Sequence, residues 1–324
     1  MDQVQRCDFC CRCCLLQKGE FGECGVRYCD GNAVIDSPEQ KIVAVHLDRI
    51  EKKPLYHFFP KEKTLSLGAL GCNLHCTFCQ NYQLSQKPYI NDFSSSLYED
   101  FPFIRMLSQC RSRVMSYTYN EPIVWQDVVL QIAEKVRQEG GFNVMVTNGT
   151  FSEKSLEIMV PHIDAFNIDF KGDESFYEEI CKAPGAFRAV SDAIEYINGQ
   201  TGKVLEVTTL VIERYHTQQI LQKMFEHLMN LGVNVIHLSR FFPAYKMSGE
   251  ISTSISCLEQ AKDIAQQCGI PYVYLGNVSL FDDRYIVCPR CGCTIERNRT
   301  SGLADDKGEL YCPSCGDLIY GRFA

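Results

Sequence analysis

This 324-residue sequence lacks several features that would assign it to common classes of protein. It has no run of eighteen apolar residues, the length that a membrane-spanning helix needs. Its first thirty residues are polar and rich in cysteine, unlike the apolar core of a secretory signal. Its net charge of −8 provides no basic face for a nucleic-acid backbone. We therefore expect a cytoplasmic protein that binds neither membranes nor nucleic acids.

Cysteine, in contrast, is abundant, with 19 residues. A secreted protein would pair them in disulfides, but the odd number and the tight C-x2-C groupings favour metal ligands in a reducing compartment. Eleven of the 19 fall in three clusters, which predict three parts. These parts are a Cys-rich metal-binding segment at residues 1–60, a core at residues 61–280 and a small metal-binding module at residues 281–324.

The first cluster has a C-x2-C-x3-C-x9-C spacing, which predicts a four-thiol metal site. Its candidate ligands are Cys7, Cys10, Cys14 and Cys24. Zinc and a second iron–sulfur cluster suit these thiols equally well, and the neighbouring Cys11 and Cys13 leave the assignment open by one residue. A structural site that stabilises a segment too small to bury its own core is the favoured interpretation.

In the central part, apolar β-rich runs alternate with helical patterns, which indicates parallel strands joined by crossover helices. The predicted strands are Thr64–Leu67, Val114–Tyr117, Asn143–Thr147, Ala165–Asp169, Lys203–Val211, Val233–Leu238 and Tyr272–Leu275. Helices are expected to begin near Pro122, Ser152, Phe187, Thr217 and Thr253, with Ser152 and Ser191 as caps. Without a dinucleotide fingerprint, this α/β pattern favours a complete or partial barrel over a doubly wound sheet.

Polar segments follow most of these strands, namely GCNLHC, TYNEP, TNGT, DFK and SRFFPAYK. Because the carboxyl ends of parallel barrel strands share one mouth, we expect these segments to face the same site. Before the first strand, Lys52, Lys53 and His57 could reach a bound anion, although a solvated basic run also explains them.

The first of these segments contains three thiols without a fourth, Cys72, Cys76 and Cys79. An iron–sulfur cube normally takes four thiolates, so three would leave one iron open for chemistry. The alternative is a zinc site completed by His75, which is disfavoured because His75 and Cys76 are adjacent and would have to share one metal.

Together these motifs resemble the radical S-adenosylmethionine enzymes. The three-cysteine loop, with Phe78 before its last thiol, is similar to that of the branch that includes pyruvate formate-lyase activating enzyme. With CGVR, EKKPLYHF, TYNEP, DFK, SRFFPAYKM, GNV and the terminal CPxCG pairs, nearly the full length resembles the radical enzyme of the AmmeMemoRadiSam system. The resemblance implies a partial (β/α)6-type TIM barrel between the Cys-rich segment and a C-terminal zinc ribbon.

The resemblance also implies the chemistry. Cys72, Cys76 and Cys79 would hold a [4Fe-4S] cluster whose open iron binds S-adenosylmethionine. One-electron cleavage would give methionine and a 5′-deoxyadenosyl radical that removes a hydrogen atom from a substrate. The cofactor contacts implied are Phe78, Asn120, Glu121, Asn148, Asp169 and Lys171.

Purely structural roles could also explain these residues. Asn120 could cap a helix whose dipole favours Glu121, and Asp169 and Lys171 could form a plain ion pair. Asn148 could belong to a simple strand-to-helix turn. In the last polar segment, Arg240 could clamp a carboxylate, and Tyr245 and Lys246 could relay protons or orient a substrate. A packed loop at the barrel mouth explains this segment equally simply.

Three classes of function follow. The first is an oxidoreductase-type radical enzyme that acts with Memo-like and AMMECR-like proteins and with an electron donor such as flavodoxin or ferredoxin. The second is an activating enzyme that generates a glycyl radical on a partner enzyme. The third, a scaffold with three structural metal sites, is disfavoured because a scaffold has no need for polar segments that converge on one mouth.

The C-terminal cluster has two matching knuckles, which predict a zinc ribbon. Its candidate ligands are Cys288, Cys291, Cys312 and Cys315. Cys293 is not expected to bind the metal. The scattered cysteines are interpreted as small apolar side chains, namely Cys110, Cys181, Cys257 and Cys268.

Overall fold

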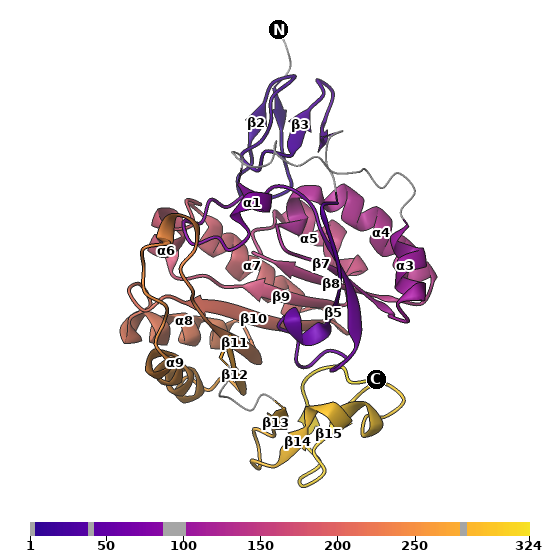
Figure 1. Cartoon of the computed structure of the whole chain (residues 1–324), viewed down its shortest axis with the longest axis vertical. Coiled ribbons are helices and arrows are strands. Elements are labelled where there is room, and N and C mark those ends of the chain that lie inside the picture. The colour runs from indigo at the N-terminus through magenta and orange to yellow at the C-terminus, as the bar shows by residue number, and fades with distance from the viewer. Residues whose placement is uncertain (1–3, 38–41, 87–101, 279–283) are drawn as a thin grey trace.

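The structure, a computed structural model, describes residues 4–37, 42–86, 102–278 and 284–324. Its centre is a single sheet with the strand order β12-β11-β10-β9-β8-β7-β6-β5 (Figure 1). The strands β6 to β12 are parallel, and β5 (Ala44–Arg49) pairs antiparallel with β6. The parallel strands are β6 (Lys63–Gly68), β7 (Val114–Tyr117), β8 (Phe142–Thr147), β9 (Ala165–Asp169), β10 (Val204–Val211), β11 (Val235–Arg240) and β12 (Tyr272–Gly276). Within the described residues β12 and β5 do not pair, so the sheet is a partial barrel.

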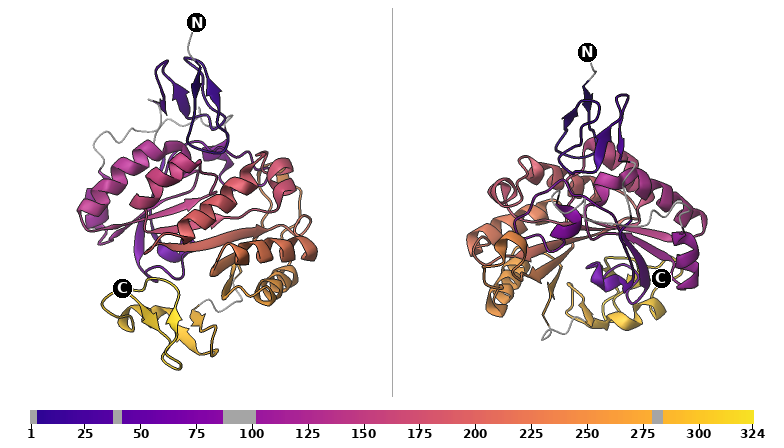
Figure 2. Two further views of the ribbon diagram at one scale, coloured as in Figure 1. Left: turned by 180° about the vertical axis from the view of Figure 1, so that it is seen from behind. Right: turned by 45° about the horizontal axis from the view of Figure 1, so that its top comes forward.

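Helices connect successive strands and cover the outer face of the sheet (Figure 2). They are α1 (Tyr82–Ser85), α3 (Phe103–Gln109), α4 (Gln126–Gln138), α5 (Glu153–Met159), α6 (Glu174–Glu179), α7 (Ala186–Asn198), α8 (Gln218–Asn230) and α9 (Ile255–Gln267). Short 3₁₀ turns are η1 (Ile50–Lys52), η2 (Pro122–Trp125), η3 (Val160–His162), η4 (Tyr245–Met247) and η5 (Arg297–Gly302). None of the helices among the described residues is both long and apolar enough to cross a membrane.

The predicted α/β partial barrel is confirmed, with strand boundaries within two residues of those expected. Ser152 caps α5 as predicted, because its hydroxyl accepts the backbone N–H of Ser155. Ser191 was expected to be a cap, and this prediction is wrong. It lies inside α7, where its hydroxyl donates to the carbonyl of Phe187 one turn earlier.

Two small modules lie at opposite ends of the barrel, as Figures 1 and 2 show. The N-terminal module contains the hairpins β1 (Gln5–Arg6) with β2 (Leu15–Leu16) and β3 (Arg27–Cys29) with β4 (Val34–Asp36). The C-terminal module contains β13 (Tyr285–Val287) with β14 (Thr294–Glu296) and β15 (Leu310–Tyr311) with β16 (Leu318–Ile319).

The predicted division into three parts has two boundaries that can be compared with the structure. The boundary at residues 280 and 281 lies outside the described residues. At the other boundary, β5 falls within the predicted segment 1–60 but belongs to the central sheet, where it pairs with β6. The Cys-rich module therefore ends before β5.

A buried polar network joins the C-terminal module to the end of the barrel where the parallel strands begin. Glu206 in β10 is fully buried and accepts hydrogen bonds from the backbone N–H groups of Tyr56 and His57. Its carboxylate also lies 2.6 Å from Nε2 of His237. Burial raises the pKa of Glu206, but the hydrogen bond and charge of His237 outweigh it, so the net shift is downward.

The C-terminal module contacts this network through Tyr320. Nδ1 of His57 lies 2.6 Å from the carbonyl oxygen of Tyr320, and Nε2 lies 2.8 Å from the hydroxyl of Tyr274. The hydroxyl of Tyr320 in turn accepts the backbone N–H of Leu205. The small module therefore contributes polar contacts that the end of the barrel would otherwise lack.

Two buried histidines predict acid sensitivity. Burial lowers the pKa of His57 and of His216 from 6.5 to about 4. Between pH 6.5 and about pH 4 the unfolded chain binds more protons than the folded chain. The free energy of unfolding therefore falls as the pH drops through this range. Each histidine adds a slope of up to about 1.4 kcal/mol per pH unit.

Urea unfolding across this pH window measures the slope. His57→Gln removes one titrating group and should flatten the slope. Equal slopes for the wild type and His57→Gln would contradict this account.

Candidate functional site

A cavity of about 380 Å³ opens at the carboxyl ends of the parallel strands. Its wall comes from the loops after β6, β7, β8 and β9, with further residues from β10 and β11. The wall includes every core residue for which a cluster or cofactor contact is predicted, namely Cys72, Cys76, Phe78, Cys79, Asn120, Glu121, Asn148, Asp169 and Lys171. The fold therefore brings together residues that lie far apart in the sequence.

The loop that holds the three thiols also directs N–H groups at their sulfur atoms. Sγ of Cys72 accepts the backbone N–H of Leu74 at 3.4 Å and the side-chain amide of Asn148 at 3.7 Å. A backbone N–H from Asn81 points at Cys79 in the same way. Burial raises the pKa of the Cys79 thiol to about 11 and that of Cys72 well above its usual value. Hydrogen bonds to sulfur are among the interactions that tune iron–sulfur clusters, so this loop fits such a group.

The zinc alternative at this loop finds no support in the geometry. The sulfur atoms around one tetrahedral zinc lie about 3.8 Å apart, since each Zn–S bond is about 2.3 Å. Among the described residues, the only four-ligand group whose ligand atoms all lie within 4.8 Å is the C-terminal one. His75, the proposed fourth ligand, instead lies 3.1 Å from Gln86 through Nδ1 and 3.4 Å from Glu23 through Nε2.

A fourth thiol, Cys181, lies beside this loop. Cys181 is fully buried after α6, and its thiol forms a hydrogen bond with Cys76. This hydrogen bond, together with burial, raises the pKa of Cys76 well above its usual value. The backbone N–H of His75 also donates to the carbonyl of Cys181 at 2.9 Å. The interpretation of Cys181 as a plain apolar side chain is therefore incomplete.

Cys181→Ser tests whether this fourth thiol binds the cluster. Three thiols suffice in our account, so Cys181→Ser should retain the iron and sulfide content of the wild type after anaerobic reconstitution. Serine preserves the hydrogen-bonding capacity of the site at little change in volume. A loss of roughly four irons per chain would instead make Cys181 a cluster ligand.

Asn120 and Glu121 connect the cluster loop to the neighbouring strands. The side-chain amide of Asn120 accepts the N–H of Ala69 and donates to the carbonyl of Gly71, so Asn120 holds the start of the loop. The cap of η2 is Glu121 rather than Asn120, because its Oε1 accepts the backbone N–H of Ile123. The alternative in which Asn120 is the cap is therefore wrong.

The carboxylate of Glu121 is almost fully buried in the cavity wall. Besides the cap, it accepts hydrogen bonds from the hydroxyl of Thr147 and the backbone N–H of Asn148, both at 2.7 Å. Burial raises its pKa to about 7 despite these donors. Capping and cofactor contact remain compatible, because the carboxylate also borders the cavity.

Asp169 and Lys171 form an ion pair of 2.8 Å beside the thiols. Burial lowers the pKa of Lys171, but the charges of Asp169, Cys76 and Cys181 outweigh it and raise the pKa well above its usual value. Nζ of Lys171 also lies 5.9 Å from the ring centroid of Phe78. Lys171 therefore keeps a positive charge where thiolates would gather.

Lys53 is a cavity residue whose role the sequence did not decide. Its ammonium is 2.8 Å from Asp48, which also accepts the hydroxyl of Tyr119 at 2.8 Å. The interpretation as a solvated residue fits the exposed Lys52 but is wrong for the buried Lys53. His57, considered with them, lies instead in the network at the opposite end of the barrel.

The three catalytic candidates lie near the mouth but are absent from the described cavity wall. Nε of Arg240 donates to the carbonyl of Thr253 at 2.7 Å. The ring of Tyr245 stacks on Tyr82 at 4.8 Å, and Lys246 lies 5.3 Å from the Tyr245 ring. The stack joins the SRFFPAYK segment to the residues just after the cluster loop. Catalysis by these residues stays a prediction.

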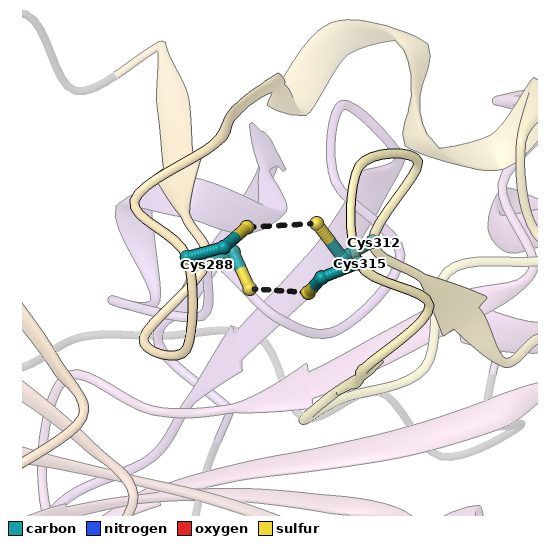
Figure 3. A group of neighbouring side chains, drawn as sticks. Cys288, Cys312 and Cys315 are labelled. Carbon is teal, nitrogen blue, oxygen red and sulfur yellow. Dashed lines mark hydrogen bonds between the residues drawn. The ribbon is translucent and has the colours of Figure 1, made fainter.

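The C-terminal thiols form a compact group that could hold one metal ion (Figure 3). Its members, Cys288, Cys291, Cys312 and Cys315, have ligand atoms within 4.8 Å of one another. Two of the sulfur pairs are Cys288 with Cys315 at 3.7 Å and Cys291 with Cys312 at 3.6 Å. These separations suit the tetrahedral zinc that the spacing predicts, and iron also fits such a set.

A family model and a curated relative match this chain. The family model of the Radical SAM superfamily matches residues 68–228. Uncharacterized protein MJ0808 of Methanocaldococcus jannaschii is 33% identical to this chain over 325 residues, which cover 98% of this chain and 96% of that protein.

Solved structures are also similar to this chain, at low identity. SuiB of Streptococcus suis bound to S-adenosylmethionine has a TM-score of 0.50 and 12% identity, and the match covers 76% of this chain and 60% of that one. A domain of pyruvate-formate lyase-activating enzyme from Bacteroides vulgatus ATCC 8482 has a TM-score of 0.43 and 16% identity, over 50% of this chain and 98% of that domain. The SuiB match shows a shared fold and nothing finer.

Proposed function

Since this chain belongs to the radical SAM superfamily, we propose that it cleaves S-adenosylmethionine reductively and uses the product to remove a hydrogen atom from a substrate. The observation that carries the proposal is the shared cavity, in whose wall three thiols, a buried carboxylate and the Asp169–Lys171 ion pair lie together. When bound, a [4Fe-4S] cluster with S-adenosylmethionine supplies one-electron cleavage to methionine and a 5′-deoxyadenosyl radical.

The residues of the chain have distinct tasks in this proposal. Cys72, Cys76 and Cys79 hold the cluster, and the ammonium of Lys171 offsets their negative charge. The amide of Asn148 donates to Cys72 and fixes its sulfur.

The carboxylate of Glu121 has a different task. It presents a hydrogen-bond acceptor to the amino group of the methionine moiety, held in place by the donors from Thr147 and Asn148. The remaining predicted contacts, Phe78, Asn120 and Asp169, complete the cofactor side of the cavity.

The finer assignment follows the resemblance of the motifs. We propose an oxidoreductase-type enzyme of the cytoplasm that acts within an AmmeMemoRadiSam system, with Memo-like and AMMECR-like proteins as partners and flavodoxin or ferredoxin as the electron donor. Arg240, Tyr245 and Lys246 border the mouth, where a substrate would enter. Activation of a glycyl radical enzyme is the alternative, and a glycine-centred radical on an added partner would favour it.

One assay tests the proposed function. The chain is reconstituted anaerobically with iron and sulfide and then given S-adenosylmethionine and dithionite. We expect methionine and 5′-deoxyadenosine in equal amounts, and the Glu121→Gln variant should form them more slowly because it loses the charge of the acceptor. A reconstituted, iron-loaded chain that forms no 5′-deoxyadenosine would overturn the proposal.

A further inference from the structure

The N-terminal thiols that the sequence left without a defined metal gather around Cys24. The backbone N–H of Cys7 donates to the carbonyl of Cys14 at 2.8 Å, and that of Cys13 donates to the carbonyl of Cys10 at 3.2 Å. A methyl group placed at Gly22 would contact the sulfur atoms of both Cys14 and Cys24 at 3.7 Å. The four predicted ligands are therefore neighbours.

Backbone N–H groups point at these sulfur atoms. Cys7 receives one from Phe9 and Cys10 one from Arg12, each two residues later in the chain. Cys24 receives one from Val26 and a second from Arg27 at 3.4 Å. Such N–H groups stabilise thiolates that bind metals, so the loops are shaped for ligation.

The spacing of the thiols distinguishes between the metals. All four sulfur atoms of the C-terminal group lie within 4.8 Å of one another, as a single ion requires. The N-terminal thiols belong to the described residues, yet they form no group that compact. Thiols that are gathered but more widely spaced suit a cluster of several irons better than one zinc ion.

The N-terminal module lies directly against the loop of the core thiols. Gly71 has a φ of +88°, and a Cβ there would lie 2.8 Å from the carbonyl oxygen of Cys24 and 2.7 Å from Val26. Two residues later, the carbonyl of Asn73 accepts Nε of Arg12 at 2.9 Å. Cys72 therefore lies between two contacts with the module.

A chain of side chains connects the two groups of thiols. The side chain of Asn73 forms a hydrogen bond with Sγ of Cys10. Its Oδ1 accepts the amide of Asn148 at 2.9 Å, and the same amide lies 3.7 Å from Sγ of Cys72. Oδ1 of Asn73 also lies 4.0 Å from Sγ of Cys72, so one asparagine side chain separates a thiol of the N-terminal group from a thiol of the core group.

A buried arginine supplies positive charge to the N-terminal group. Arg27 is 1% exposed, and its Nε donates to the carbonyl of Val124 at 2.9 Å. Its guanidinium also lies 2.6 Å from Asp127 and 3.5 Å from the ring centroid of Phe9. The backbone N–H of Arg27 lies 3.4 Å from Sγ of Cys24, so this charged residue adjoins the N-terminal group.

We propose that Cys7, Cys10, Cys14 and Cys24 hold a second iron–sulfur cluster that passes electrons to the core cluster. The step rests on the proposed function, which consumes one electron for each S-adenosylmethionine cleaved. A one-electron carrier protein of the flavodoxin or ferredoxin class reduces the N-terminal cluster. That cluster is reoxidised when the same electron moves to the core cluster, so no other reactant is needed.

Metal analysis of the reconstituted full chain tests the site. We expect about eight irons and eight sulfides per chain for the wild type, with about one zinc in the C-terminal group. The double variant Cys7→Ser/Cys14→Ser should lose about half of the iron and sulfide. These two positions are chosen because the contacts with Gly71 and Asn73 come from Cys24, Cys10 and Arg12. Zinc in the N-terminal module, or full iron retention in the variant, would overturn the proposal.

Two further variants test the assignment of the N-terminal ligands and the presence of a separate N-terminal cluster. Cys13→Ser changes a cysteine of the same module outside the assigned set and should keep the iron content of the wild type; a loss there would overturn the ligand assignment. Cys72→Ala should keep the N-terminal iron, about four atoms per chain, with its own reduced electron paramagnetic resonance signal. No residual iron and no signal in Cys72→Ala would also overturn the proposal.

The choice of reductant separates the relay from the catalytic function. In Cys7→Ser/Cys14→Ser, formation of 5′-deoxyadenosine should stay within twofold of the wild type with dithionite, which reaches the core cluster directly. With reduced flavodoxin it should fall at least tenfold. Equal rates with flavodoxin would overturn the relay alone, whereas no 5′-deoxyadenosine from the wild type with dithionite would overturn the proposed function.

Discussion

Cys76→Ala is expected to abolish formation of 5′-deoxyadenosine and to remove roughly four irons per chain. Cys76 is the most buried of the three core thiols and interacts with the Cys181 thiol and with the charge of Lys171. Two thiols cannot hold the cube, so the loss should be complete rather than partial. Cys72→Ala and Cys79→Ala should show the same losses of iron and of 5′-deoxyadenosine formation as Cys76→Ala.

The matched control for this prediction is His75→Gln, which changes the residue next to Cys76. His75 is engaged by Gln86 and Glu23, so its replacement should leave the core iron in place. Iron and sulfide analysis, together with a 5′-deoxyadenosine assay, measures both effects in the two variants. Full iron retention in Cys76→Ala, or complete iron loss in His75→Gln, would contradict the assignment of the ligands.

The second large effect is expected at the opposite end of the barrel, where Cys312→Ser should release the C-terminal metal and unfold its module. The apolar cluster that includes Ile286, Leu310 and Phe323 also contains Tyr56 and Tyr274 of the barrel. Metal binding contributes about 10 kcal/mol or more to folding in small zinc modules, which the short hairpins cannot replace.

Loss of the module should also weaken the barrel, because His57 and Leu205 would lose their contacts with Tyr320. Each buried polar group left without a partner costs about 1–3 kcal/mol, so we expect the midpoint of thermal unfolding to fall by roughly 5–15 °C. Zinc analysis, limited proteolysis and calorimetry measure these effects. Cys293→Ser is the matched control and should keep the metal, because Cys293 lies outside the compact group. An unchanged midpoint in Cys312→Ser would contradict the coupling.

The sequence was sufficient to predict the barrel and the cluster and cofactor residues that lie in the wall of its cavity. Each polar segment follows a strand directly, and parallel strands bring such segments to one mouth, so local patterns determine the long-range result. Glu121, Asn148 and Lys171 meet beside the thiols for this reason. Cysteine spacing within one short loop is equally local.

Features that depend on packing between distant segments could not be predicted. No motif surrounds Cys181, and it reaches Cys76 only because the chain after α6 folds against the cluster loop. The contact of Cys24 with Gly71 likewise depends on how the N-terminal module docks. Ser191 had the right residue type for a cap, but α7 begins earlier, at Ala186, so the residue lies inside the helix.

The central claim is that three thiols hold a cluster that cleaves S-adenosylmethionine in the cavity beside Glu121 and Lys171. The most direct test is the yield of 5′-deoxyadenosine from the anaerobically reconstituted full chain, measured with its iron, sulfide and zinc content. The account predicts multiple turnovers in the wild type and none in Cys76→Ala. Zinc at the core loop, or an iron-loaded wild type that leaves S-adenosylmethionine intact under strong reductant, would contradict it.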